Sequence, residues 1–253
     1  MFLWQVAAVL ALLPMSFLVE AAGQASFGIE PAGPPRTEVP QELRNRLEAS
    51  GTRLFRTVNG IDIPVAELWW VKSLTVHSSG KTRARAEYAE LTPGKLLAVL
   101  YLPAELEDVK NQKIPPGFYT LRYAQRNREK DAHDKEEEEE DQEAREDEHK
   151  HSGGEYRDYV LLARLQPDKP TRTYLKLTEM LELSRQVSPG KKPVMLALPP
   201  LNPAYKAFPY AVLDDQGNCA IQFKLPVQFA SGKRSEMRIA ILLVNPPNVS
   251  EED

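Results

Sequence analysis

Residues 54 to 66 read LFRTVNGIDIPVA, and this stretch decides the fold class. Apolar and polar side chains alternate on both sides of Asn59-Gly60, as they do along strands with one buried face. Both turn residues accept the positive φ angles of a type I′ turn, so the stretch predicts a β-hairpin. Because proline cannot donate to a ladder, we expect the part of the strand around Pro64 to lie at an edge or a bulge.

Short apolar segments separated by turn residues continue along the chain. Thr92-Pro93-Gly94-Lys95 suits a type II turn, with glycine at the position that needs a positive φ. Helical spacing is limited to two short segments, residues 41–49 after Pro40 and a helix beginning near Thr178. The further strands expected are residues 96–102, 118–123, 156–165, 194–198, 210–213, 220–225 and 237–244.

Many short strands with few helices exclude a parallel α/β sheet, which needs a helix between successive strands. The sequence therefore predicts a mostly β fold, an antiparallel β-sandwich-like domain with two short helices, over residues 41–247. Cys219 is the single cysteine, which excludes an intramolecular disulfide. We expect it to be a buried apolar residue.

The N-terminal residues resemble an export signal. An apolar run from Phe2 to Val19 is followed by Gly23 and Ala25, a small-x-small pair that predicts a signal peptide over residues 1–25. The protein is then expected in the periplasm or outside the cell, without a stable transmembrane span after cleavage. The run lacks a preceding Lys or Arg, so an uncleaved membrane anchor stays open as an alternative. Residues 26–40 are rich in Pro and Gly and predict an extended tether, and residues 248–253 predict a tail.

An acidic block interrupts the chain between two expected strands. Residues 129–150 hold 13 acidic and four basic residues, a net charge of −9, so the rest of the chain carries +5 within the total of −4. A block that repels itself and has few apolar side chains to bury predicts a disordered loop insertion over residues 129–154.

Three histidines lie in or beside this insertion. His133, His149 and His151, together with Glu146, are a candidate metal-ligand set, because imidazole and carboxylate groups bind divalent cations. Weak divalent binding is the only cofactor interaction the sequence suggests. A solvated loop without bound metal is the alternative.

Glu67-Leu68-Trp69-Trp70 places two tryptophans side by side on an expected strand. Neighbours on a strand face opposite ways, so one ring should enter the core and the other should be exposed. Trp70 with Tyr88 or Tyr101 is then a candidate platform for a glycan or a protein partner. Core packing of both tryptophans is the alternative.

No catalytic residues can be assigned from the sequence. It lacks the G-x-S-x-G and H-E-x-x-H motifs, and outside the acidic insertion (129–154) His77 is the only histidine. The basic residues do not form a nucleic-acid recognition pattern, so no nucleic acid partner is expected. We therefore expect a non-catalytic binding or accessory protein whose partner is a protein or glycan of the cell envelope. An exported hydrolase or metal-dependent enzyme is the alternative.

Three segments carry a resemblance to a group of proteins. Residues 117–123 (GFYTLRY), 67–69 (ELW) and 156–162 (YRDYVLL) make the chain similar to exported, β-rich bacterial proteins of unknown function. The resemblance implies a bacterial, periplasmic setting and transfers no site residues. It also implies that the acidic insertion is an addition to the common domain.

Overall fold

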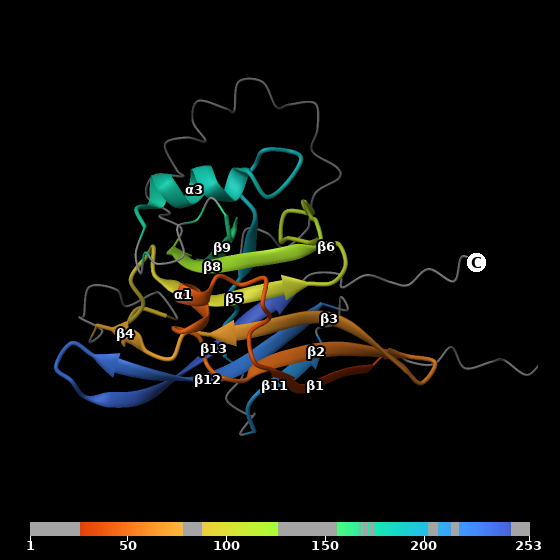
Figure 1. Ribbon diagram of the computed structural model, residues 1–253, viewed down its shortest axis with the longest axis horizontal. Helices are drawn as coiled ribbons and strands as arrows, with labels where there is room; N and C mark the ends of the chain where they lie inside the picture. The colour runs from red at the N-terminus through yellow and green to blue at the C-terminus, as the bar shows by residue number, and fades with distance from the viewer. Residues whose placement is uncertain are drawn as a thin grey trace, which may run out of the picture.

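The computed structural model describes residues 26–77, 88–125, 156–166, 168, 172, 175–201, 207–213 and 218–243. The predicted signal peptide (1–25), the acidic insertion (129–154) and the tail (248–253) lie outside the described residues. The described chain is mostly β, with antiparallel sheets and two short helices (Figure 1), which confirms the predicted fold class.

The larger sheet has seven strands, each antiparallel to its neighbours, in the order β1-β2-β3-β5-β8-β9-β10. Its strands are β1 (Ser26–Gly33), β2 (Gly51–Val58), β3 (Ile61–Trp70), β5 (Leu96–Leu102), β8 (Gly117–Gln125), β9 (Asp158–Arg164) and β10 (Met195–Ala197).

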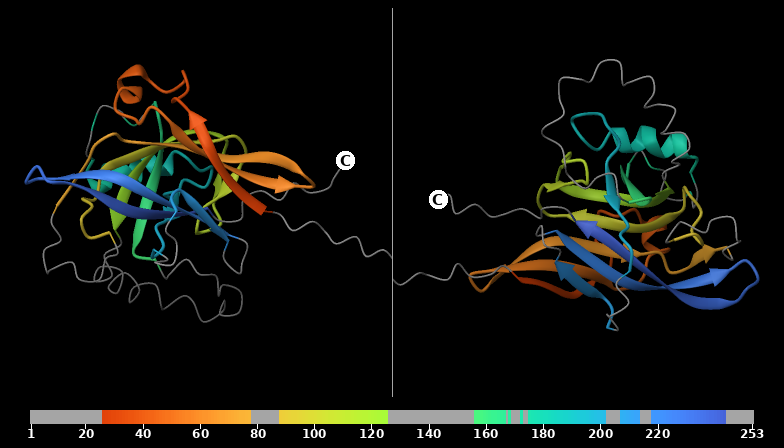
Figure 2. Two further views of the ribbon diagram at one scale, coloured as in Figure 1. Left: turned by 90° about the horizontal axis from the view of Figure 1, so that it is seen from below. Right: turned by 180° about the vertical axis from the view of Figure 1, so that it is seen from behind.

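The smaller sheet has four strands and lies against the larger one (Figure 2). It consists of β11 (Tyr210–Leu213), β12 (Cys219–Phe229) and β13 (Arg234–Leu243), with β4 (Leu74–Val76) parallel to the end of β12. β11 lies close to β1 and β13 close to β10, so the edges of the two sheets meet. A separate two-stranded ribbon is formed by β6 (Leu106–Glu107) and β7 (Lys113–Ile114).

The hairpin predicted from residues 54–66 is confirmed as β2 and β3. Asn59 and Gly60 have φ angles of 51° and 80°, as a type I′ turn requires. The pairing shifts where Leu54 opposes Ala66 and Phe55 opposes Pro64, so the proline stands beside a bulge. On its other side β3 pairs with β5 only over Glu67–Trp70, and the proline therefore interrupts no ladder there.

The predicted tether is wrong for its first half, because Ser26–Gly33 forms strand β1 and pairs with β2. An edge strand tolerates proline, and the pairing of β1 shifts just after Pro31. Gly28 has a specific role, since a Cβ there would lie 2.1 Å from the Cζ atom of Phe55. The missing side chain lets the phenyl ring cross the edge strand.

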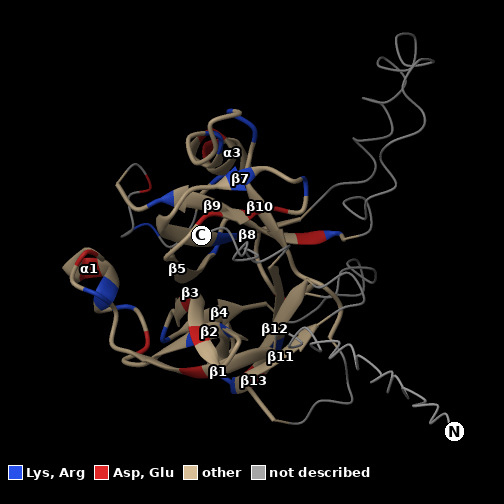
Figure 3. Cartoon of the chain, turned by 90° about the vertical axis from the view of Figure 1, so that its right-hand side faces the viewer, with Lys and Arg blue, Asp and Glu red and all other residues tan. Residues whose placement is uncertain are grey.

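Both helices lie on the outer side of the larger sheet (Figure 3). α1 covers only Gln41–Arg44, shorter than the expected 41–49, because Leu47 instead forms a bridge with Val71 at the end of β3. α3 (Leu177–Arg185) packs against β9, and the Glu179 carboxylate accepts a hydrogen bond from the Lys176 amide at its start. Neither of these helices is long and apolar enough to cross a membrane.

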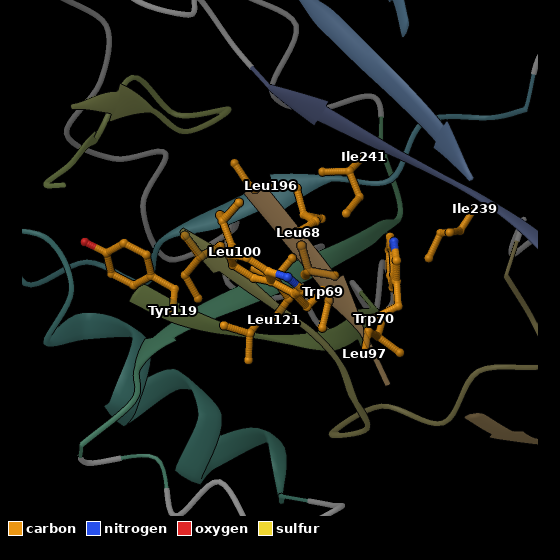
Figure 4. Packing of buried hydrophobic residues seen from close by; sticks show 14 of the residues in the cluster. Leu68, Trp69, Trp70, Leu97, Leu100, Tyr119, Leu121, Leu196, Ile239 and Ile241 are labelled. Carbon is orange, nitrogen blue, oxygen red and sulfur yellow. The ribbon is translucent and has the colours of Figure 1, made fainter. Parts of the chain in front are cut away.

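The main core fills the space between the two sheets. Cys219 is fully buried there, as predicted. Figure 4 shows part of this packing. Leu68, Trp70, Leu100 and Leu196 of the larger sheet meet Ile239 and Ile241 of β13 in the smaller sheet. On the outer side of the larger sheet, where α1 lies, Val39, Leu43 and Leu47 are buried and belong to the same core cluster.

Candidate functional site

The two tryptophans of β3 do face opposite ways, but both are buried. Trp70 is 6% exposed and packs edge-on against Phe223 of the smaller sheet, with ring centroids 4.9 Å apart. Trp69 lies on the other face, where its indole Nε1 donates to the carbonyl oxygen of Gly33 at 3.0 Å. The prediction of an exposed Trp70 platform is therefore wrong, because this part of the sheet is covered on both sides.

Tyr88 is also part of the interior and is 1% exposed. Its hydroxyl donates to the carbonyl oxygen of Pro199 at 2.8 Å and accepts from the amide of Ala240 at 3.0 Å. Pro199 follows β10 and Ala240 belongs to β13, so the hydroxyl joins the two sheets where their edges meet. Its expected role in partner contact is replaced by a structural one.

Tyr101 is half-buried and belongs to a row of side chains that crosses five strands. The residues of this row stand directly opposite one another from β1 to β8, in the order Glu30, Arg53, Glu67, Tyr101 and Phe118. The Tyr101 and Phe118 rings are 4.6 Å apart between centroids. Directly opposed pairs of this kind stabilise a sheet by about 0.2–1 kcal/mol each.

Two arginines bind the buried carboxylate of Glu67, namely Arg53 within this row and Arg36 from outside it. Arg36 donates from Nε and Nη2 to the two carboxylate oxygens, both at 2.9 Å, and Arg53 Nε donates to Oε1 at 2.9 Å. The Arg36 guanidinium also lies 4.1 Å from the centroid of the Tyr101 ring. Because Tyr101 already contacts Arg36 and Phe118, the geometry favours a structural role for it over ligand stacking.

The predicted metal ligands His133, Glu146, His149 and His151 lie outside the described residues, so weak divalent binding stays a prediction. Within the described ranges, no group of three or more His, Cys, Asp and Glu side chains comes together.

The most deeply buried ion pair among the described residues joins Arg122 of β8 to Asp168. The guanidinium Nε donates to Oδ2 at 2.7 Å and Nη2 donates to Oδ1 at 2.9 Å. The carboxylate also accepts the Thr120 hydroxyl, while the guanidinium reaches the carbonyl oxygens of Gly94 and Arg172. All these contacts fix loops to the sheet, which favours a structural role for the pair.

Asp108 is another buried carboxylate, located between β6 and β7. Oδ1 accepts from the amides of Lys110 and Gln112, and Oδ2 accepts from the Gln112 side chain and the Met195 amide. Burial raises the pKa of this carboxyl above its ordinary value, while these four hydrogen bonds lower it. The carboxylate thereby ties the small ribbon to β10.

The outer face of the smaller sheet carries an exposed group that sequence reasoning missed. Lys224 of β12 and Arg238 of β13 stand directly opposite each other. Both cations lie over the ring of Phe208, with Lys224 Nζ 5.5 Å and Arg238 Cζ 5.1 Å from its centroid. We call Phe208, Tyr210, Lys224 and Arg238 the aromatic–cationic face.

Tyr210 and Gln222 extend this face by one cross-strand row. Tyr210 is 37% exposed and stands opposite Gln222, which stands opposite Ala240. Gln222 is 3% exposed, and its side-chain Oε1 has no hydrogen-bond partner among the described residues. The row therefore combines an exposed aromatic ring with an unused buried acceptor.

The alternation of polar and apolar residues along β12 and β13 was the available signal for this face. We expected strands over 220–225 and 237–244, whereas the structure extends them to Phe229 and back to Arg234. The pairing of Lys224 with Arg238 depends on the hairpin register, which the shorter strands did not define.

Comparisons with protein-family models, with curated proteins and with solved structures found no match for this chain.

Proposed function

We propose that the chain is a non-catalytic binding or accessory module of the bacterial cell envelope, and that it contacts its partner through the aromatic–cationic face. The observation that carries the proposal is the position of Phe208 over two directly opposed cations, beside the exposed ring of Tyr210. Exposed aromatic residues and arginine are enriched at interaction surfaces, because they supply large contact areas together with a polar group.

The use of the buried ionisable groups supports binding over catalysis. Asp168, Asp108 and Glu67 each accept several hydrogen bonds from neighbouring residues. A catalytic carboxylate needs room to exchange a proton with a substrate. These three carboxylates instead hold strands and loops in place.

The location in the envelope rests on the sequence. The apolar run and the Gly23 and Ala25 pair support export, and the absence of cysteine pairs is compatible with a domain that folds by packing alone. The resemblance to exported bacterial proteins points to the same compartment.

Binding of envelope material tests the proposal. The protein is immobilised and exposed separately to polysaccharide and protein fractions of the native envelope. We expect Phe208→Ala and Tyr210→Ala to reduce capture of one fraction at least fivefold. Ile61→Ala is the matched control, because Ile61 is 66% exposed and begins β3 of the larger sheet, whereas the aromatic–cationic face belongs to the smaller sheet. Equal capture by all four proteins would contradict the proposed surface.

A further inference from the structure

We propose that the ligand of the aromatic–cationic face is an acidic polysaccharide, whose carboxylates bind Lys224 and Arg238 and whose sugar rings pack on Phe208 and Tyr210. This inference rests on the proposed function and adds the chemical class of the partner.

Lys224 and Arg238 are two cations that stand directly opposite each other. Like charges in opposed positions of an antiparallel pair destabilise the sheet. Among the described residues, Lys224 pairs with the carboxylate of Glu236 at an Nζ–Oε2 distance of 3.3 Å. Both side chains are exposed, and exposed ion pairs contribute little to stability. A carboxylate bound between Lys224 and Arg238 would turn the repulsion into attraction.

The charges around Lys224 and Arg238 on the outer face of the smaller sheet also favour an acidic ligand. Alternation along β13 places Arg234, Glu236 and Arg238 on the same side of the strand, and all three are exposed. With Lys224 on β12, the described residues of this face comprise three cations and one carboxylate. The excess positive charge is complementary to a polymer with one negative charge on each unit.

The aromatic residues favour a ligand with sugar rings over an acidic polymer without them. The polar hydroxyls and apolar C–H faces of a sugar match an aromatic ring flanked by polar groups. Tyr210 is exposed and Phe208 is half-buried beside it. Gln222, in the same row as Tyr210, adds a polar side chain, and its Oε1 accepts no hydrogen bond from the described residues.

Calorimetry with defined polymers tests the inference on the full chain. Polygalacturonate is the acidic polysaccharide, dextran the neutral one and polyglutamate the acidic polymer without sugar rings. We expect binding of polygalacturonate, at least tenfold weaker binding after Lys224→Gln or Arg238→Gln, and a similar loss after Phe208→Ala. Lys192→Gln is the control, because it removes one exposed positive charge from the loop before β10.

The pattern of results separates the two proposals. Equal affinity for dextran and polygalacturonate, or unchanged affinity after Arg238→Gln, would overturn the acidic specificity while leaving a glycan-binding face. Equal affinity for polyglutamate, with no effect of Phe208→Ala, would overturn the sugar component. If Phe208→Ala and Tyr210→Ala leave binding of every polymer and every envelope fraction unchanged, the proposed surface fails as well.

Discussion

Arg36 and Glu67 form a two-point ion pair, with both nitrogen–oxygen distances at 2.9 Å, and they are separated by 31 residues in the chain. The pair fixes the segment before α1 over the outer face of β3. The carboxylate is 2% exposed whereas the Arg36 side chain is 38% exposed, so removing the carboxylate leaves the arginine partly solvated. This contact therefore contributes less than a fully buried ion pair would.

We expect Glu67→Gln to lower the free energy of unfolding by about 1–3 kcal/mol, because an amide group cannot accept all the hydrogen bonds from Arg36 and Arg53. Urea unfolding measures the change. Glu30→Gln is the control, since Glu30 is 47% exposed and its pair with Arg53 should contribute at most about 1 kcal/mol. Equal losses for the two variants would contradict the central position of Glu67.

Trp70→Ala tests the corrected position of this ring. We expect a loss of about 3–5 kcal/mol in the free energy of unfolding, because the cavity would open between the two sheets beside Phe223. Ile61→Ala, at the exposed start of β3, should stay within about 0.5 kcal/mol of the wild type. If Trp70→Ala were as mild as the control, the tryptophan would belong to the surface.

The strand pattern and the first hairpin could be predicted because their causes are local. Asn59-Gly60 supplies the turn angles, and the alternation beside it supplies the buried face. Residues 26–33 gave no such signal, because their pairing depends on ring contacts from other strands. The Phe55 ring lies over Gly28. The Trp69 ring lies over Gly51, where an added Cβ would be 2.4 Å from the indole Nε1.

The candidate site was harder to predict than the fold, because it depends on what covers each face. Alternation placed Trp69 and Trp70 on opposite faces, but no pattern in the sequence indicates that the segment around Leu43 covers the outer one. The pairing of Lys224 with Arg238 likewise follows from a long hairpin register. The residue pattern along one strand does not specify its register with the neighbouring strand.

Lys95 is a cation held in an unfavourable environment at the start of β5. Burial, followed by the positive charge of Arg46, lowers the pKa of Lys95 below its ordinary value of 10.5. The folded chain therefore binds this proton more weakly than the unfolded chain, and stability rises as pH increases from the lowered pKa towards 10.5. At neutral pH the charged form is the destabilising one.

We expect Lys95→Gln to raise the free energy of unfolding at pH 7 by about 0.5 kcal/mol, and the gain should shrink in high salt. Chemical denaturation at low and high ionic strength measures both effects. Lys72→Gln removes an exposed charge whose ammonium donates to the carbonyl oxygen of Asn45 at 3.0 Å, so it should give no gain. A loss of stability in Lys95→Gln would show that the ammonium has a favourable partner.

The raised pKa of Asp108 makes stability fall as pH rises, which is opposite to the effect of Lys95. Burial is the largest influence and raises the pKa of its carboxyl above 3.8, despite the four N–H donors around it. The folded chain then holds this proton more tightly than the unfolded chain. Its contribution to stability is complete below pH 3.8 and declines as pH rises through the raised pKa.

Asp108→Asn removes this titration but keeps the shape of the side chain. The variant should lose about 1–3 kcal/mol in the free energy of unfolding at every pH, because an NH2 group replaces one of the two carboxylate oxygens. These oxygens accept the hydrogen bonds that hold the site together, including those from Gln112 and Met195. The difference in the free energy of unfolding between wild type and variant should be largest at pH 3 and should shrink towards pH 7. Urea titrations at each pH measure it. A difference that grows with pH would mean that the four hydrogen bonds, rather than burial, determine the protonation of Asp108.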